Sequence, residues 1–192
     1  MADTKSKTHD QIADWVGDIV ALESHVEEAM DKQLKLEANN PTLTATIKRF
    51  HDSVRDSKGR AVKFQEQYGS EAGNPILKAG STVLGKAAGL IDMVREDSIS
   101  KSLRDDYTAY NLLAMAYTML HTTSMALEDH ETKSFAEQGL RTYARLVQDV
   151  NHVMPEAVLH DLKKNSDYNV QDTAIVDECR RTIESIWKQT ND

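Results

Sequence analysis

Apolar residues recur every three or four positions along most of the chain, the spacing that places them on one face of a helix. The first such stripe runs as far as about Leu36 and consists of Ile12, Trp15, Val16, Ile19, Leu22, Val26 and Met30. It predicts a long helix that follows a polar, flexible segment over residues 1–10. Val, Ile, Thr and aromatic residues never alternate with polar residues at period two, so we expect no strand. The pattern predicts an all-α protein.

A second stripe begins after Asn40, which is suited to cap a helix, and Pro41, which is suited to its first turn. Its members are Leu43, Ile47, Phe50, Val54, Ala61, Phe64 and Tyr68. This helix is predicted to end at Gly69. Glycines and a proline then mark a loop from Gly69 to Pro75, and a shorter helix is predicted over about 75–95.

The third long helix is predicted from about Ser98 to Asp129, and its uncharged centre from Leu112 to Leu120 indicates the most buried helix. Thr132 is the expected cap of the fourth, which should end at Pro155. The stripe of this helix is Phe135, Leu140, Tyr143, Leu146, Val147, Val150 and Val153. Two shorter helices are expected over about 155–164 and 172–188. The second carries Ile183, Ile186 and Trp187 on one face, so it should dock on the bundle or on another subunit.

The connections within the first and second pairs of long helices are short, and short connections force antiparallel neighbours. The connection between the two pairs has about thirty residues and a helix of its own. We therefore expect an antiparallel four-helix bundle over 11–154, built as two helical hairpins joined by a helical crossover. Residues 155–192 should form a C-terminal helical extension that packs on it. A repeat solenoid would need self-similarity at a fixed period, which the chain lacks.

Composition excludes several classes of function. A net charge of −8 with 23 Lys and Arg disfavours a nucleic-acid partner, which requires a concentrated basic face. No apolar run is long enough to span a membrane. The amino terminus lacks the apolar stretch of a secretory signal, and Cys179 cannot form an internal disulfide, so a cytoplasmic location is expected.

The segment Gly80–Ala87 has the glycine and lysine spacing of a phosphate-binding loop. Such a loop needs a Ser or Thr after the lysine and a strand before it. Ala87 stands at the hydroxyl position, and no strand is predicted before Gly80. We therefore interpret these small residues as close helix packing and expect no cofactor.

Polar residues on the apolar stripes are the candidates for a site. Glu23 lies four residues after Ile19 and three before Val26, and a buried carboxylate needs partners. A candidate buried cluster drawn from all four long helices is Glu23, Asp56, Arg60, Tyr110, Tyr117, His121 and Tyr143. Plainer alternatives are that Glu23 reaches solvent, that Asp56 leans away from the apolar centre, and that His121 is a structural core histidine.

Four segments resemble the YciF-like branch of the ferritin-like superfamily, within residues 10–155: Ile19–Glu23, Ser53–Arg60, Tyr107–Leu120 and Phe135–Val147. The resemblance implies a ferritin-like bundle in which Glu23 matches a metal-binding glutamate. The family's Glu-Thr-x-x-His pattern is replaced here by the residues from Asp56 to Arg60. The remaining carboxylates expected by resemblance fall near Tyr110 or Leu113 and near Tyr143.

Arginine is permanently charged and cannot bind a cation, so Arg60 disfavours a metal centre. We therefore expect a non-enzymatic ferritin-like protein with a degenerate metal centre. The resemblance implies a stress-associated structural or interaction role and, by analogy, a homodimer. The alternative is a metal-binding di-iron or manganese oxidase, or an iron-handling protein, whose atypical ligands would be Glu23, Asp56, His121 and Tyr143. The sequence does not identify a small-molecule ligand.

Overall fold

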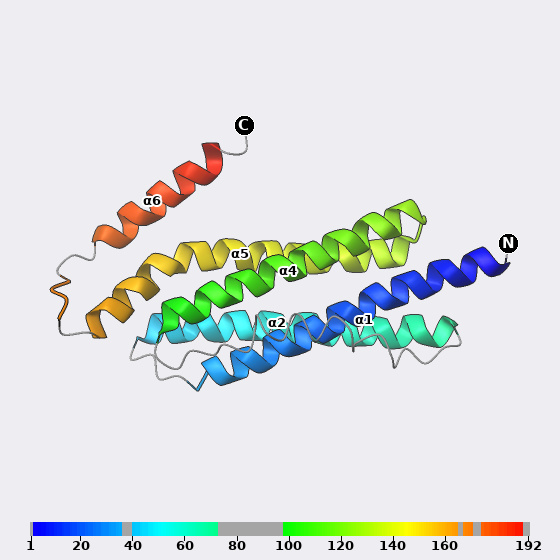
Figure 1. Ribbon diagram of the computed structural model, residues 1–192, viewed down its shortest axis with the longest axis horizontal. Coiled ribbons are helices and arrows are strands. Elements are labelled where there is room, and N and C mark those ends of the chain that lie inside the picture. The colour runs from blue at the N-terminus through cyan, green and yellow to red at the C-terminus, as the bar shows by residue number, and fades with distance from the viewer. Residues whose placement is uncertain (1, 36–39, 73–97, 165–166, 171–173, 190–192) are drawn as a thin grey trace.

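The computed structural model describes residues 2–35, 40–72, 98–164, 167–170 and 174–189. Within these ranges the chain forms helices and no strand, which confirms the all-α prediction for the described residues. The helices are α1 (Ala2–Gln33), α2 (Pro41–Ala72), α4 (Ile99–Ala126), α5 (His130–Lys164) and α6 (Ala174–Gln189) (Figure 1). The crossover helix predicted near 75–95 and the glycine-rich segment 80–87 lie outside the described residues.

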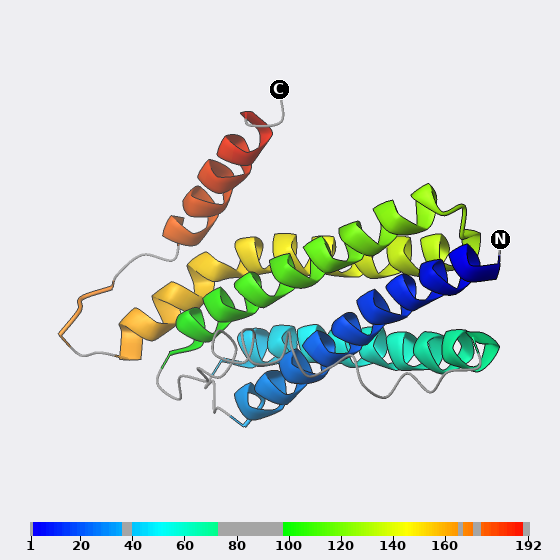
Figure 2. The ribbon, with the colours of Figure 1, turned by 45° about the vertical axis from the view of Figure 1, so that its right-hand side comes forward.

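The four long helices form a bundle in which α1 packs on α2 and α4, and α5 packs on α4 and α2. Contacts between helix ends fix their directions. Gln33 at the end of α1 donates to Asp106 near the start of α4 over 2.7 Å, and Asn40 before α2 contacts Glu156 late in α5. Packed neighbours are therefore antiparallel. Helices α2 and α4 run in the same direction, so α2 ends at the opposite end of the bundle from the start of α4 (Figure 2).

Side-chain caps begin three of the long helices. Asn40 Oδ1 accepts from the backbone N–H groups of Thr42 and Leu43, which confirms the predicted cap of α2. Ser98 caps α4. The prediction for α5 was wrong, because Asp129 rather than Thr132 is the cap: Asp129 accepts from both the backbone N–H and the hydroxyl of Thr132.

Three predicted helix ends also differ from the structure. Helix α1 begins at Ala2, so the segment predicted to be flexible is helical. Helix α2 continues past Gly69 to Ala72. Helix α5 passes through Pro155 and ends at Lys164, so the expected boundary at residue 155 falls inside a helix. Proline costs a helix one backbone hydrogen bond, but buried contacts at Val153 and Ala157 on either side hold this segment against the bundle.

The core lies where the apolar stripes of the four long helices meet, and its largest fully buried side chains include Tyr110, Tyr117, Tyr143 and Phe50. Helix α4 was predicted to be the most buried helix, yet its outward side exposes Leu112, Met115 and Met119. Helix α6 has no buried residue and packs on α5. Among the described helices, none is long and apolar enough to cross a membrane.

Candidate functional site

One buried carboxylate, on α1, is contacted by one residue from each of the other three long helices. Glu23 of α1 is fully buried, and its Oε1 accepts three hydrogen bonds. The donors are the hydroxyls of Ser57 on α2 at 2.7 Å, Tyr117 on α4 at 2.9 Å and Tyr143 on α5 at 2.9 Å. We call these four residues the Glu23 cluster. It is a polar centre enclosed by an apolar core.

The local sequence explains why these side chains point inward. Ser57 lies three residues after Val54 and four before Ala61, both buried, so it occupies the apolar stripe of α2. On α5, Gly139 leaves room for the ring of Tyr117: a Cβ atom built at Gly139 would lie 2.1 Å from that ring. The missing side chain of Gly139 therefore allows the Tyr117 hydroxyl to reach Glu23.

The electrostatics of the Glu23 cluster reflect burial opposed by hydrogen bonds. Burial raises the pKa of the Glu23 carboxyl, while the three hydroxyl donors and the charge of Arg60 lower it. Burial, reinforced by the Glu23 charge, raises the pKa of Tyr117 and of Tyr143 well above the ordinary range. Both phenols therefore stay neutral and act as donors. The second oxygen of Glu23, Oε2, has no hydrogen-bond partner within the described part of the chain.

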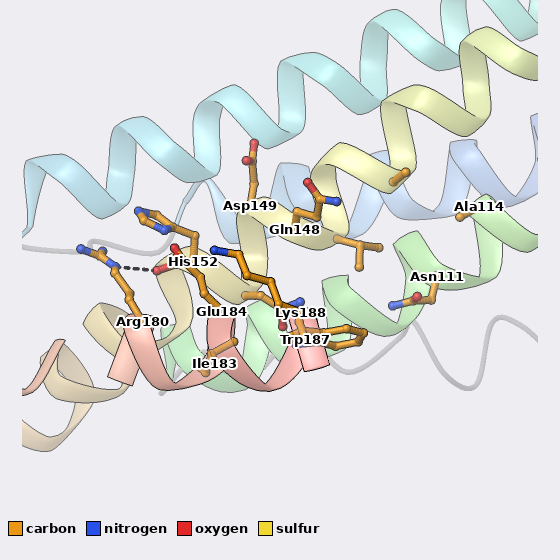
Figure 3. A pocket seen from close by; sticks show the side chains of 13 residues that line it. Asn111, Ala114, Gln148, Asp149, His152, Arg180, Ile183, Glu184, Trp187 and Lys188 are labelled. Atoms are coloured by element: carbon orange, nitrogen blue, oxygen red, sulfur yellow. Dashed lines mark hydrogen bonds between the residues drawn. The ribbon is translucent and has the colours of Figure 1, made fainter. Parts of the chain in front are cut away.

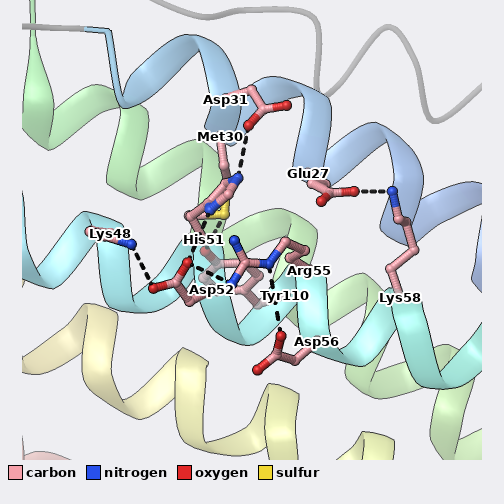
Figure 4. A network of polar contacts seen from close by, with 10 residues as sticks. All are labelled: Glu27, Met30, Asp31, Lys48, His51, Asp52, Arg55, Asp56, Lys58 and Tyr110. Carbon is pink, nitrogen blue, oxygen red and sulfur yellow. Dashed lines mark hydrogen bonds and ion pairs between the residues drawn. The ribbon is translucent and has the colours of Figure 1, made fainter.

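The predicted cluster included Asp56, and this was wrong. The Asp56 side chain is 67% exposed and faces Arg55 on the outer side of α2 (Figure 4). One position along a helix turns the side chain by about 100°, so Asp56 points outward where Ser57 points inward. Ser57 lies on the apolar stripe of Val54 and Ala61, and this spacing indicated that it is buried. The prediction named the neighbouring Asp56 instead, because a carboxylate was expected there.

For three other predicted residues, the hydrogen bonds in the described part of the chain go to partners other than Glu23. Tyr110 is buried, but its hydroxyl lies 3.2 Å from the sulfur of Met30. His121 is part-buried and pairs with Glu137 at 3.2 Å, so it does not join the cluster. Arg60 is half-buried at the margin, where it donates to the Thr142 hydroxyl at 3.3 Å while its charge acts on Glu23.

A second buried carboxylate, Asp106, lies near the start of α4. Its Oδ1 accepts one hydrogen bond, from the Gln33 side-chain amide at 2.7 Å. Its Oδ2 has no hydrogen-bond partner among the described residues. Burial, with a smaller contribution from the charge of Asp105, raises the pKa of Asp106 to about 7. Sequence reasoning missed this residue because it follows Asp105 in a stretch that reads as polar.

The outer face of the first hairpin is covered by ion pairs between α1 and α2 and along α2 (Figure 4). Lys58 pairs with Glu27, and His51 contacts Asp31 at 2.8 Å. Along α2, Lys48 lies 2.9 Å from Asp52. Such partly exposed pairs contribute little to stability individually. They do make this face strongly polar.

A pocket of about 740 Å³ lies between α4, α5 and α6 (Figure 3). Trp187 and Ile183 of α6 line it together with Val147 of α5. At one end Arg180 donates to the backbone carbonyl of His152 at 2.9 Å. None of the lining residues belongs to the Glu23 cluster.

The residues at the bundle centre do not fit a two-metal site. A di-metal centre in a helical bundle uses several carboxylates and imidazoles. The Glu23 cluster offers one carboxylate and three protonated hydroxyls, with the guanidinium of Arg60 close by. Across the described parts of the chain, no three His, Cys, Asp or Glu side chains lie close enough together to hold a metal ion.

The fold and its centre define a helical-bundle protein with a buried, hydrogen-bonded carboxylate. The chain matches the family described as "Domain of unknown function (DUF892)" over residues 7–163, and it belongs to that family. The match begins inside the first turns of α1, covers the rest of the four-helix bundle nearly to the end of α5, and stops before α6. No curated protein and no solved structure matches the chain significantly.

Proposed function

We propose that this chain is a ferritin-like bundle whose metal centre has been replaced by the Glu23 cluster, and that it acts as a non-enzymatic structural or interaction protein. The observation that carries the proposal is the convergence of three hydroxyl donors from three helices on Glu23 Oε1. The antiparallel hairpins, with α2 and α4 running in the same direction, support the ferritin-like part. The stress-associated role rests on the YciF-like resemblance.

The pattern of replacements supports a structural role for the centre. By the YciF-like resemblance, Asp56 and Arg60 stand at the glutamate and histidine of the Glu-Thr-x-x-His pattern, but Asp56 points away from the centre and Arg60 cannot bind a cation. A buried polar network of this sort favours one packing arrangement over others, because any shift of a helix leaves a buried group unpaired. The Glu23 cluster would thus fix how the two hairpins meet.

The alternative, a metal-binding oxidase or iron-handling protein, has less support. Its ligand set required Asp56 and His121 to join Glu23 and Tyr143. Asp56 pairs with Arg55 and His121 pairs with Glu137, both away from the cluster.

Metal content tests the proposal directly. The protein is expressed with added iron or manganese, and its metal content is measured by mass spectrometry for the wild type, Glu23→Ala and the exposed control Glu66→Ala. We expect well below one metal ion per chain in all three. Stoichiometric metal in the wild type and the control that disappears in Glu23→Ala would overturn the proposal in favour of the oxidase or iron-handling protein.

A further inference from the structure

Three buried side-chain oxygens without a hydrogen-bond partner lie where the end of α1 meets the start of α4. They are Asp106 Oδ2, Gln33 Oε1 and Ser102 Oγ, and none of them is paired within the described residues. The three residues are 4%, 5% and 2% exposed. Buried polar atoms are nearly always paired, so three unpaired oxygens at one junction point to a bound partner. We call these three residues the Asp106 site.

The hydrogen bond between Gln33 and Asp106 places two of these oxygens side by side. Gln33 Nε2 donates to Asp106 Oδ1 at 2.7 Å. Gln33 Oε1 is bonded to the same carbon as this nitrogen, and Asp106 Oδ2 to the same carbon as this oxygen, so both unpaired acceptors flank the bond. Turning the amide over would bring its oxygen against the carboxylate, which also accepts only. The amide orientation is therefore fixed.

The third oxygen belongs to Ser102, which lies one turn before Asp106 on the same side of α4. Serine hydroxyls in helices often donate to the carbonyl four residues earlier, as Ser24 does at 2.7 Å and Ser53 at 2.9 Å. Ser102 makes no such bond, although it is buried. Its lone pairs are therefore available to a ligand that also contacts Asp106.

The charge of Asp106 has no positive partner in the described part of the chain. The neighbouring Arg104 donates to Asp105 at 2.6 Å, and Lys32 near the end of α1 pairs with Glu28 at 3.5 Å. Asp105 adds a like charge, and the carboxyl end of α1 adds the negative end of a helix dipole. A buried carboxylate in such surroundings needs a cation.

We propose that Asp106 Oδ2, Gln33 Oε1 and Ser102 Oγ bind one monovalent alkali cation, Na⁺ or K⁺. All three ligands are oxygens, which hard cations prefer, and the set contains none of the nitrogen or sulfur ligands that transition metals favour. One carboxylate balances one positive charge. Ca²⁺ requires about six to eight oxygens, more than this site offers. A water molecule would pair the oxygens but would leave the carboxylate charge without a partner.

The Asp106 site is separate from the Glu23 cluster. Gln33 follows Glu23 by ten residues on α1, which corresponds to about 15 Å along the helix. The inference therefore does not depend on whether the Glu23 cluster binds metal. It predicts that alkali cations reduce the cost of the Asp106 charge in the folded protein.

Thermal unfolding in different chloride salts tests the site at pH 8, where the Asp106 carboxyl, with its pKa of about 7, is ionised. All salts are used at one ionic strength so that screening is constant. Tetramethylammonium is the reference cation, because it is too large to fit between buried oxygens. Sodium or potassium should raise the unfolding temperature of the wild type by about 2 to 4 °C above this reference, since a ligand that binds only the folded state stabilises it.

Variants assign the effect to the site. Asp106→Asn should lose the dependence on the cation, because an amide has no charge to balance, and Ser102→Ala should weaken it. The matched control is Asp56→Asn, which removes a carboxylate that is 67% exposed and should keep the full dependence. Circular dichroism checks that each variant keeps its helices.

Equal unfolding temperatures of the wild type in all three salts would overturn the inference, because a water molecule or another group of the chain would then pair the oxygens. An undiminished response in both Asp106→Asn and Ser102→Ala would overturn it as well, since the cation would act elsewhere. A larger stabilisation by millimolar calcium or magnesium than by sodium or potassium would contradict the assignment to a monovalent ion.

Discussion

Glu23 and Asp106 are both buried carboxylates, yet their surroundings differ. Glu23 receives three hydroxyl hydrogen bonds on one oxygen and lies near the charge of Arg60. Asp106 receives one amide hydrogen bond and lies near the like charge of Asp105. Burial disfavours the charged form of both, but donors oppose this effect more strongly at Glu23. The comparison shows two surroundings for a buried carboxylate: Glu23 has three donors and a nearby cation that offset part of the cost of burial, whereas Asp106 has one donor and a like charge beside it.

The largest loss of stability is expected from crowding the Glu23 cluster. Gly139→Ala would place a methyl group against the Tyr117 ring, which must move and lose its hydrogen bond to Glu23. We expect a loss of about 3 kcal/mol in the free energy of unfolding, measured by urea denaturation. Gly59→Ala is the control, because a Cβ atom there meets nothing within 4 Å. It should stabilise the protein by about 0.5 to 1 kcal/mol; equal effects of the two variants would contradict the packing argument.

The largest gain in stability is expected from a substitution that removes the charge of Asp106. The pKa of Asp106 is raised from 3.8 to about 7, so the folded protein binds a proton that the unfolded chain releases between these values. Stability therefore falls as pH rises from about 4 to about 7, and the full penalty is present above pH 7. Asp106→Asn should raise the free energy of unfolding by up to about 4 kcal/mol at pH 8, the full value of a shift from 3.8 to about 7, and change it little at pH 4.

Urea denaturation of the wild type and Asp106→Asn across this pH range gives the measurement. The two curves should converge in acid and separate above neutrality. A constant difference at all pH values would show that the effect comes from packing rather than from the proton.

Removing one donor from Glu23 should have a smaller effect. Tyr143→Phe deletes a 2.9 Å hydrogen bond to the buried carboxylate, and we expect a loss of about 1 to 2 kcal/mol in the free energy of unfolding. Tyr110→Phe is the matched control, since the one hydrogen bond of its hydroxyl within the described residues goes to the weak acceptor Met30 Sδ. Equal losses in the two variants would contradict this expectation, because the hydrogen bond to Glu23 would then contribute no more than the hydrogen bond to Met30.

The smallest effect is expected outside the core. Asp56→Ala removes an exposed carboxylate that pairs loosely with Arg55 at 3.8 Å. The free energy of unfolding should change by less than about 0.5 kcal/mol. A loss comparable to that of Tyr143→Phe would return Asp56 to the buried cluster.

Much of the fold could be predicted from the sequence because a helix of period 3.6 converts spacing directly into a face. The apolar stripes predicted the four long helices, and Asn40 predicted the start of α2. The helix ends were less predictable. Pro155 is a local stop signal, but the buried contacts of the following turn keep the helix intact.

The candidate site was predictable only in part. The position of Glu23 between Ile19 and Val26 indicated burial, and the structure buries it. Tyr117 and Tyr143 lay on apolar stripes and both reach Glu23. His121 and Tyr110 lay at equally plausible positions, but they meet Glu137 and Met30 instead. Which inward residues touch depends on the relative height of the helices, and spacing along one helix does not contain that information.

By itself the sequence determined the helices, their buried stripes and the need of Glu23 for partners, because each of these follows from residue type and helical period. Only the tertiary structure decided that Ser57 rather than Asp56 supplies a donor, and that Met115 faces solvent although it lies in an uncharged stretch. The physical reason is that the rotation and height of each helix are set by its neighbours. A turn of about 100° between adjacent residues then separates the centre of the bundle from its surface.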